Sequence, residues 1–536
     1  MVALKLDALK MRAEWEQAGV SLPAFDIAAM RQKTAQTPTW VHFGAGNIFR
    51  GFIAPLQQTL LEKGLVGEGV IAAETYDGEI VERIYRPYDD LALLVTLKAD
   101  GSMEKKVVAS IAGALRADTQ LGELARVFEA PLLQMASFTI TEKGYALRDM
   151  RGAWLPIAER DFAAGPERPT SAMAVVTALL RRRYLAGAKP ITLCSMDNCS
   201  KNGEKLRAAV CDMARAWQER GLAEDGFVAY VEDESRVSFP WSMIDKITPR
   251  PDAQVEKQLE ADGIADMRPI TTEKHTFIAP FTNAEAPQYL VIEDRFPGGR
   301  PPLEEAGVLM TTRERVGKAE RMKVTTCLNP LHTALAVYGC VLRMPSIAAC
   351  MRDAGLSELV RRIGYQEGLP VVTDPVILDP KAFLREVIEQ RLPNPFIPDT
   401  PQRIASDTSQ KVGIRFGETI KAYCESPALD AGKLTYIPLA LAGWLRYLLA
   451  VDDEGAAFPL SPDPLLGELT PMLQGVRLGE PLPKENVEQL RAFLQNKQVF
   501  GANLHKAGLE DKIITILGQL LAGKGAVRQT LRQYLA

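Results

Sequence analysis

The chain has 536 residues, 24% of them charged, and a formal net charge of −4 with acidic and basic residues interspersed along its length. This length is about three times that of one ordinary domain, so it predicts at least two domains with substantial cores. The charge pattern offers neither a basic stripe for a phosphate backbone nor an acidic tail, which argues against nucleic acid as a partner.

The first 19 residues include several acidic side chains and predict a short amphipathic helix rather than a secretory signal, which needs an uncharged apolar core. The longest apolar stretch, residues 434–451, contains Pro438 and Arg446 and is barely long enough to cross a bilayer, so it predicts a buried helix. We therefore expect a cytoplasmic protein without a membrane partner, either a monomer or a small homo-oligomer.

Short β-branched runs alternate with helical stretches from Thr39 to about Ser200, as in a parallel sheet with crossover helices. The candidate strands are residues 40–43, 69–73, 107–111, 136–140 and 191–196. Helical periodicity marks residues 122–128 and 171–186 between them. This order predicts a Rossmann-like, doubly wound α/β domain.

The second half of the chain has mostly helical periodicity, in residues 310–328, 331–354, 380–390 and 487–496. A proline- and glycine-rich stretch at residues 296–302 is the best linker candidate. We therefore predict a dinucleotide-binding domain with extensions over residues 1–300 and a mainly α-helical substrate domain over residues 301–536.

Gly44-Ala45-Gly46 directly follows a predicted strand and precedes a helical stretch that begins near Asn47. Glycines there let the backbone approach a pyrophosphate, and the first free amides of the helix favour its negative charge. Phe49 stands where the dinucleotide fingerprint has its third glycine, so the match is partial. The alternative is that the two glycines only form a tight turn between strand and helix.

Glu74 closes the next predicted strand, where an acidic side chain would accept hydrogen bonds from the adenosine ribose and repel a 2′-phosphate. This favours NAD over NADP as the cofactor, although an exposed carboxylate at a strand end needs no such role. The seven cysteines are scattered, with no CxxC pair and no histidine at ligand spacing, so we expect neither a metal site nor a structural disulfide.

The densest group of polar residues lies between Glu320 and His332 and includes Lys323 and Asn329. Asn329 before Pro330 predicts a helix start, with the asparagine side chain capping free amides. Glu320 and Lys323 would share one face of the preceding helix. Each feature alone has an ordinary structural explanation: a solvated lysine, a cap, a local histidine hydrogen bond.

Oxidation of a secondary alcohol by hydride transfer needs a base for the hydroxyl proton and donors for the developing alkoxide. Lys323 can be this base if burial or a positive nicotinamide ring lowers its pKa towards neutrality. Asparagine amides can be the donors, and Asn198 follows a predicted strand at the end where such sites lie.

At these residues the sequence resembles the mannitol dehydrogenase family of long-chain, zinc-independent polyol and hexonate dehydrogenases. The resemblance covers most of the chain. Its motifs are HFGAGNIFRGF from His42, TITEKGY from Thr139, SMDNCSKNG from Ser195, FPWSMIDKITP from Phe239, VIEDRFPGGRPPLEEAG from Val291, the segment from Lys323 to His332, and DTSQK from Asp407.

The resemblance implies a dinucleotide domain followed by a helical substrate domain, with the reaction in the cleft between them. It implies that Lys323 is the general base, that Asn198 and Asn329 polarise the reacting oxygen, and that His332 binds a substrate hydroxyl. By the same likeness Glu320 gates proton release to water. Lys411, in the DTSQK motif, is a further substrate-binding candidate.

One spacing departs from the family pattern, in which four residues separate the lysine from the asparagine. Here Val324 to Leu328 make five. Because one extra residue rotates a helix by about 100°, a bulge or a helix break must realign Lys323 and Asn329 if both act on one substrate.

The sequence looks closer to the hexonate branch of the family, which interconverts a keto-uronate such as fructuronate with mannonate, than to the mannitol enzymes. A substrate carboxylate requires a cation, and Arg300, Arg403 and Arg415 are unranked candidates. The alternatives are a polyol dehydrogenase that converts mannitol or arabinitol to a ketose, a dehydrogenase for phosphorylated or carboxylated hydroxy acids, and a dinucleotide-binding sensor without catalysis.

Overall fold

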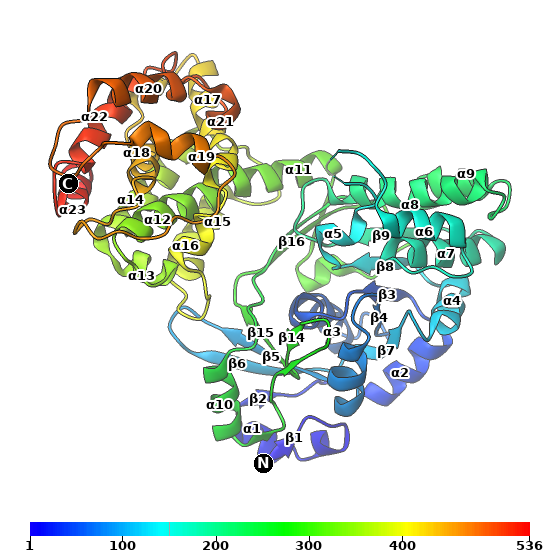
Figure 1. Ribbon diagram of the computed structural model, residues 1–536. Helices are drawn as coiled ribbons and strands as arrows, with labels where there is room; N and C mark the ends of the chain where they lie inside the picture. Colours follow the sequence, from blue (N-terminus) through cyan, green and yellow to red (C-terminus); the bar gives the residue numbers. More distant parts are fainter. Residues whose placement is uncertain (150) are drawn as a thin grey trace. The chain divides into compact units, whose positions relative to one another are not determined.

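The computed structural model describes residues 1–149 and 151–536, and the chain divides into two compact units (Figure 1). The first unit comprises Met1–Leu97 and Ser102–Gly317, and the second comprises Lys98–Gly101 and Lys318–Ala536. The predicted boundary after residue 300 falls inside the first unit. The reason is that β17 (Leu309–Thr311) pairs with β16 (Tyr289–Glu293) in a sheet of that unit.

The central sheet of the first unit has six strands in the order β10-β9-β8-β3-β4-β7, and every neighbouring pair is parallel. The strands are β3 (Trp40–Phe43), β4 (Val70–Glu74), β7 (Ile111–Arg116), β8 (Met135–Phe138), β9 (Ile191–Ser195) and β10 (Val237–Ser238). The chain winds from β3 to β7 on one side and continues from β8 to β10 on the other. The predicted doubly wound fold is therefore confirmed, with its switch point between β3 and β8.

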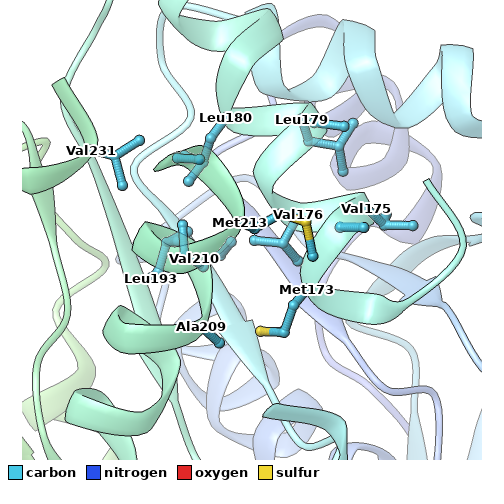
Figure 2. Packing of buried hydrophobic residues seen from close by; sticks show 14 of the residues in the cluster. Met173, Val175, Val176, Leu179, Leu180, Leu193, Ala209, Val210, Met213 and Val231 are labelled. Carbon is cyan, nitrogen blue, oxygen red and sulfur yellow. The ribbon is translucent and has the colours of Figure 1, made fainter. Parts of the chain in front are cut away.

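Both faces of this sheet are apolar because helices cover each of them. On one face, Leu193 of β9 packs with side chains of α7 (Ala172–Leu185), α8 (Asn202–Glu219) and α9 (Phe227–Glu232), as Figure 2 shows. The opposite face packs against a helix that runs through η2 (Phe49–Ile53) and α3 (Ala54–Glu62). The first face also packs against α4 (Leu121–Glu129), α5 (Thr141–Tyr145) and α6 (Pro156–Ala164).

Smaller sheets extend the first unit. A four-stranded sheet has the order β15-β5-β6-β2, and a three-stranded sheet has the order β11-β16-β17. Their remaining bounds are β2 (Val20–Ser21), β5 (Ala92–Leu97), β6 (Met103–Val108), β11 (Ser242–Asp245) and β15 (Phe281–Glu285). Two short pairs join β1 (Val2–Ala3) to β12 (Ile264–Ala265) and β13 (Ile270–Thr271) to β14 (Phe277–Ile278).

Two local expectations for this unit are wrong. The predicted strand at residues 107–111 is the end of β6 and the start of β7, because the chain passes there from one sheet to the other. Ala109 donates its amide to Gln58, and Ser110 donates its hydroxyl to the Ala54 carbonyl. The N-terminal amphipathic helix is reduced to η1 (Asp7–Lys10) and α1 (Arg12–Gln17), since the first residues form β1 instead.

The second unit is mainly helical, as predicted. Its centre is α12 (Asn329–Val341), which packs against α18 (Tyr436–Tyr447), and α18 in turn packs against α22 (Glu510–Leu520). The helix α11 (Arg313–Met322) begins in the first unit and enters the second at Lys318. The other helices are α13 (Ile347–Arg352), α14 (Ala354–Arg362), α15 (Pro380–Glu386), α16 (Pro401–Ile404), α17 (Glu418–Glu425), α19 (Leu466–Leu469), α20 (Lys484–Leu494), α21 (Lys497–Phe500) and α23 (Ala526–Leu535).

The apolar stretch at residues 434–451 forms α18, which is buried from Ile437 to its end. The prediction of a buried helix is thus confirmed. Among the residues that the structure describes, no helix has the length and apolar character to span a membrane.

Candidate active site

The glycine turn follows β3 at the switch point of the sheet. Gly44 has φ +103°, and a Cβ atom there would lie 2.3 Å from the Thr139 carbonyl oxygen, so only glycine fits. At Gly46 a Cβ atom would meet nothing within 4 Å. Gly44 is therefore required by the packing of the turn, whereas Gly46 borders open space at the edge of the sheet where dinucleotides bind.

The helix after the turn begins at Asn47 and contains a π-helical turn, η2, instead of running straight into α3. Phe49, at the place of the missing third glycine, stacks on His42 with ring centroids 4.4 Å apart. The side-chain oxygen of Asn47 accepts a hydrogen bond from buried Arg50. Since the first amides of a helix have no partner within it, the backbone of this turn can bind an anion.

Glu74 ends β4 and holds the glycine turn in place. One carboxylate oxygen accepts the amide of Ala45 at 2.9 Å, and the other accepts the amides of Tyr76 at 2.7 Å and Asp77 at 3.0 Å. The side chain is 7% exposed. Its position at the strand end is as predicted, but the structure adds a role that the sequence pattern did not indicate: the carboxylate ties two loops together.

Asn198 lies on the exposed loop between β9 and α8, which neighbouring side chains fix. The Asp197 carboxylate accepts hydrogen bonds from the amides of Ile140 and Thr141 and from the Tyr145 hydroxyl. The buried Asn202 amide donates to the carbonyls of Asp197 and Ser242. Sequence reasoning missed Asp197, Tyr145 and Asn202, although all three stand in the motifs TITEKGY and SMDNCSKNG.

Gly44 follows β3, Glu74 ends β4 and Asn198 follows β9, so all three stand at the carboxyl edge of the parallel sheet. The structure brings the predicted cofactor-binding residues of the first unit together at this edge.

Lys323 begins a π-helical turn, η6 (Lys323–Cys327), that continues α11 towards α12. The amide of Leu328 donates to the Lys323 carbonyl, five residues back, where an α-helix would use four. A π-turn takes up one extra residue, and so offsets the rotation that five intervening residues would otherwise impose. The Lys323 side chain is 4% exposed, which excludes a solvated surface lysine.

Asn329 is the first residue of α12 rather than its cap. Leu328 is the N-cap residue, with φ −130° and ψ −62°, and no side chain caps the helix. The predicted capping role is wrong because Pro330 takes the second helical position, one place later than expected. The Asn329 amide is thereby not used as a cap, while its carbonyl accepts the Thr333 hydroxyl at 3.1 Å.

His332 lies one turn into α12, on the same face as Asn329. Its buried Nε2 atom has no hydrogen-bond partner, although Asp399 Oδ2 lies 3.4 Å away. Burial, followed by the positive charges of Arg415, Arg403, Arg391 and Lys411, lowers the pKa of His332 to about 3. The imidazole is therefore neutral and has one ring nitrogen available to a ligand.

Glu320 and Lys411 complete the predicted set in the second unit. Glu320 is half-buried in α11, one turn before Lys323. Lys411 is half-buried after η10 (Thr408–Gln410) and donates to the Ser406 carbonyl, and burial lowers its pKa. Its positive charge acts on His332, so Lys411 lies in the same region as the start of α12.

Within the described part of the chain, no group of three or more His, Cys, Asp or Glu side chains is arranged to hold a metal ion. All seven cysteines are free thiols.

A doubly wound sheet with a glycine turn at its switch point, followed by a helical unit with a buried lysine, defines a two-domain dinucleotide-binding dehydrogenase. The sequence model of the Mannitol dehydrogenase Rossmann domain matches residues 38–305, and that of the Mannitol dehydrogenase C-terminal domain matches residues 316–521. The chain belongs to the mannitol dehydrogenase family, and the predicted family is thus confirmed.

Similarity to curated proteins extends over the full length. The chain is 49% identical over 535 residues to the D-mannonate oxidoreductase of Thermotoga maritima, covering 99% of this chain and 98% of that protein. Two solved structures share the fold at 24% identity. A substrate-free D-sorbitol dehydrogenase has a TM-score of 0.79 over 97% of this chain and 98% of its own. The Pseudomonas fluorescens mannitol 2-dehydrogenase ternary complex with NAD and D-mannitol has a TM-score of 0.69 over 100% and 99%.

The lowered pKa of His332 predicts that its imidazole stays neutral from pH 8 down to pH 5, because the folded protein binds the proton only near pH 3. The unfolded chain would bind it near pH 6.5, so this histidine costs stability as the pH falls through that interval. Nitrogen-15 NMR of the histidine rings measures the titration, with the His332 signal assigned from a His332→Gln variant. A midpoint above pH 5 contradicts the described environment.

Proposed function

We propose that the protein catalyses the reversible, NAD-dependent oxidation of a secondary alcohol of an open-chain hexonate to its ketone, with Lys323 as general base. The substrate class is that of mannonate and fructuronate. Full-length identity of 49% to a D-mannonate oxidoreductase is the observation that most strongly supports this class. The family's C-terminal domain and the burial of Lys323 support the same reaction.

The first unit fits a dinucleotide. Gly46 leaves open space beside the first helical amides, and Glu74 holds Ala45 in the turn. Gly44, Gly46 and Asn47 would hold the pyrophosphate through their backbone. Glu74 retains acceptor capacity for ribose hydroxyls, because two carboxylate oxygens have about four lone-pair sites for three donors. Its negative charge supports NAD over NADP. When bound, NAD supplies the hydride acceptor.

The proposed proton transfer uses Lys323, Asn329, His332 and Glu320 of the second unit and Asn198 of the first. Lys323 Nζ, as the neutral amine, takes the hydroxyl proton while the carbon loses hydride, which leaves a ketone and one ammonium. Burial favours the neutral form of an amine. Asn198 and Asn329 donate hydrogen bonds to the oxygen as negative charge develops on it. Glu320, one helical turn from Lys323, passes the proton on to water. His332, being neutral, binds a substrate hydroxyl through Nε2.

A polyol dehydrogenase is the second candidate, because both solved relatives are named for polyols and share the fold.

A dehydrogenase for phosphorylated substrates has less support. Of the basic run Arg181 to Arg183, Arg181 pairs with Glu224, Arg182 pairs with Glu129, and buried Arg183 donates to backbone carbonyls. A sensor without catalysis does not explain a buried lysine beside Asn329 and His332. Cytoplasmic location and oligomeric state stay predictions.

Gly46→Ala distinguishes a cofactor turn from a merely structural one. The new Cβ atom meets no protein atom, so the melting temperature should stay within about 2 °C of the wild type. The methyl group would occupy the space beside the pyrophosphate, so we expect the NADH dissociation constant, measured by fluorescence, to rise at least tenfold. An unchanged NADH affinity would favour the structural turn. Gly44→Ala is the contrast, since its Cβ atom clashes with the Thr139 carbonyl and should destabilise the fold itself.

The proposed reaction predicts turnover of mannonate or fructuronate with NAD at a kcat/KM at least a hundredfold above that for mannitol, mannitol 1-phosphate or any reaction with NADP. A panel of these substrates with both cofactors measures it.

Lys323→Ala should lose at least a thousandfold in kcat and keep its NADH affinity, because removing a general base costs about that much. Lys381→Ala, an exposed lysine of the same unit, should behave as the wild type.

Three results of this panel would overturn parts of the proposal. A higher kcat/KM for mannitol than for the hexonates would establish a polyol dehydrogenase. No turnover of any sugar, despite NADH binding, would favour a dinucleotide-binding sensor without catalysis. Near-normal turnover by Lys323→Ala would remove the lysine from the mechanism.

A further inference from the structure

Two cations of the second unit, Arg415 and Lys411, lie close to His332; Lys411 also feels the negative charges of Asp407 and Asp463, whereas Arg415 has no such acid among the described residues. Arg415 Nη1 donates a hydrogen bond to the hydroxyl of Thr333, the residue after His332 in α12. Lys411 precedes it by one turn, and the positive charge of Arg415 is one cause of the lowered pKa of Lys411. Both side chains are half-buried. A cation held at partial burial without an acid, as Arg415 is, is unfavourable unless an anion joins it.

The three arginines that qualified as carboxylate partners differ in how their charge is balanced. Arg300 is held between Asp294 at 2.9 Å and Glu304 at 2.5 Å in the first unit. Arg403 pairs with Asp399, and its side chain is 63% exposed. Arg415 forms no ion pair with any carboxylate of the described residues, and burial lowers its pKa to about 10. Its charge alone is left without an anion.

Close packing holds the backbone around Arg415 in place before any ligand binds. Arg415 lies in a π-helical turn, η11 (Gly413–Gly417), whose two terminal glycines press against the C-terminal end of α21. A Cβ atom at Gly417 would lie 2.0 Å from the Phe500 carbonyl oxygen, and one at Gly413 would lie 2.8 Å from that of Val499. The same turn packs against η6, which carries Lys323, and against α12. This packing limits how far the guanidinium can move.

The guanidinium of Arg415 also keeps donors for a ligand. Thr333 engages Nη1, whereas Nε and Nη2 make no hydrogen bond within the described residues. These two nitrogens form one edge of the guanidinium, the fork that binds both oxygens of a carboxylate. The neighbouring Nε2 of His332 lacks a partner as well.

We propose that Arg415, with Lys411 beside it, binds the carboxylate of the hexonate and thereby selects a sugar acid over a neutral polyol. The assignment rests on the proposed function and identifies the side chains that bind the carboxylate of its substrate. A carboxylate neutralises the charge of Arg415 and fills its fork, with Lys411 adding to the attraction. The terminal hydroxymethyl group of a polyol leaves the charge of Arg415 uncompensated, so it binds this end weakly.

Arg415→Met tests the assignment because it keeps the length of the side chain and removes the charge. We expect the KM for mannonate or fructuronate to rise about a hundredfold, with NADH affinity unchanged. For mannitol, as substrate or as inhibitor, the constant should change less than about threefold. Arg415→Lys, which keeps the charge but not the fork, should raise the hexonate KM about tenfold. Thr333→Val, which releases Nη1, should give a smaller increase.

Arg385→Met, at an exposed position of α15, is the matched control and should leave every constant unchanged. A wild-type enzyme that turns over no hexonate would refute the proposed function. A wild-type enzyme active on hexonates whose Arg415→Met and Arg415→Lys variants keep the hexonate KM within about threefold would refute the role of Arg415 alone. If Arg415→Met does not fold, Arg415→Lys and Thr333→Val decide the question through the same KM ratio.

Discussion

The hydrogen bond from the Leu328 amide to the Lys323 carbonyl is the contact on which the proposed chemistry of the second unit depends. It closes a turn five residues long and lets the chain carry one more residue between Lys323 and Asn329 than an α-helix would tolerate. The following break at Leu328 starts α12 with Asn329 at its first position, so the asparagine amide is not needed as a cap. His332 and Thr333 then follow on the same face of α12. One irregular turn thus sets the orientation of the proposed base, the proposed amide donor and the neutral imidazole together.

π-helical turns also occur elsewhere in the chain. The helix after the glycine turn contains a π-turn, and so does the segment that carries Arg415. In the first unit, two carboxylates hold the loops at the carboxyl edge of the sheet: Glu74 binds the Ala45 amide, and Asp197 binds the Ile140 amide after β8. π-turns are often found at functional sites because they redirect side chains at little cost to the helix. Of the six π-turns in the described residues, three lie at the glycine turn, at the proposed base and at the proposed carboxylate ligand. The other three are η3 (Val81–Tyr85), η7 (Ile363–Gly368) and η9 (Val387–Arg391).

Much of this arrangement could be predicted from the sequence, and the exceptions have identifiable causes. The strand at Trp40–Phe43 and the buried helix at residues 434–451 follow from local apolar patterns, which are strong where an element is buried on all sides. The single strand predicted at residues 107–111 failed because periodicity does not show that a chain leaves one sheet for another. The extra residue before Asn329 signalled a bulge, but only the backbone shows that the bulge is a π-turn. Arg300, Arg403 and Arg415 could not be ranked, because the acids that neutralise an arginine are set by the fold: Asp399 four residues before Arg403, Asp294 and Glu304 on either side of Arg300, and none for Arg415.

Chemical rescue of Lys323→Ala tests the central claim most directly, because it asks whether an amine at that place is what the reaction lacks. The rate of hydride transfer from a bound hexonate is followed as NADH absorbance in a single turnover, with small alkylamines of graded basicity added. If Lys323 is the base, the slow variant should speed up with amine concentration and more so with the more basic amines, whereas Asn329→Ala should not respond. Hydride transfer in Lys323→Ala at the wild-type rate without any amine would contradict the account.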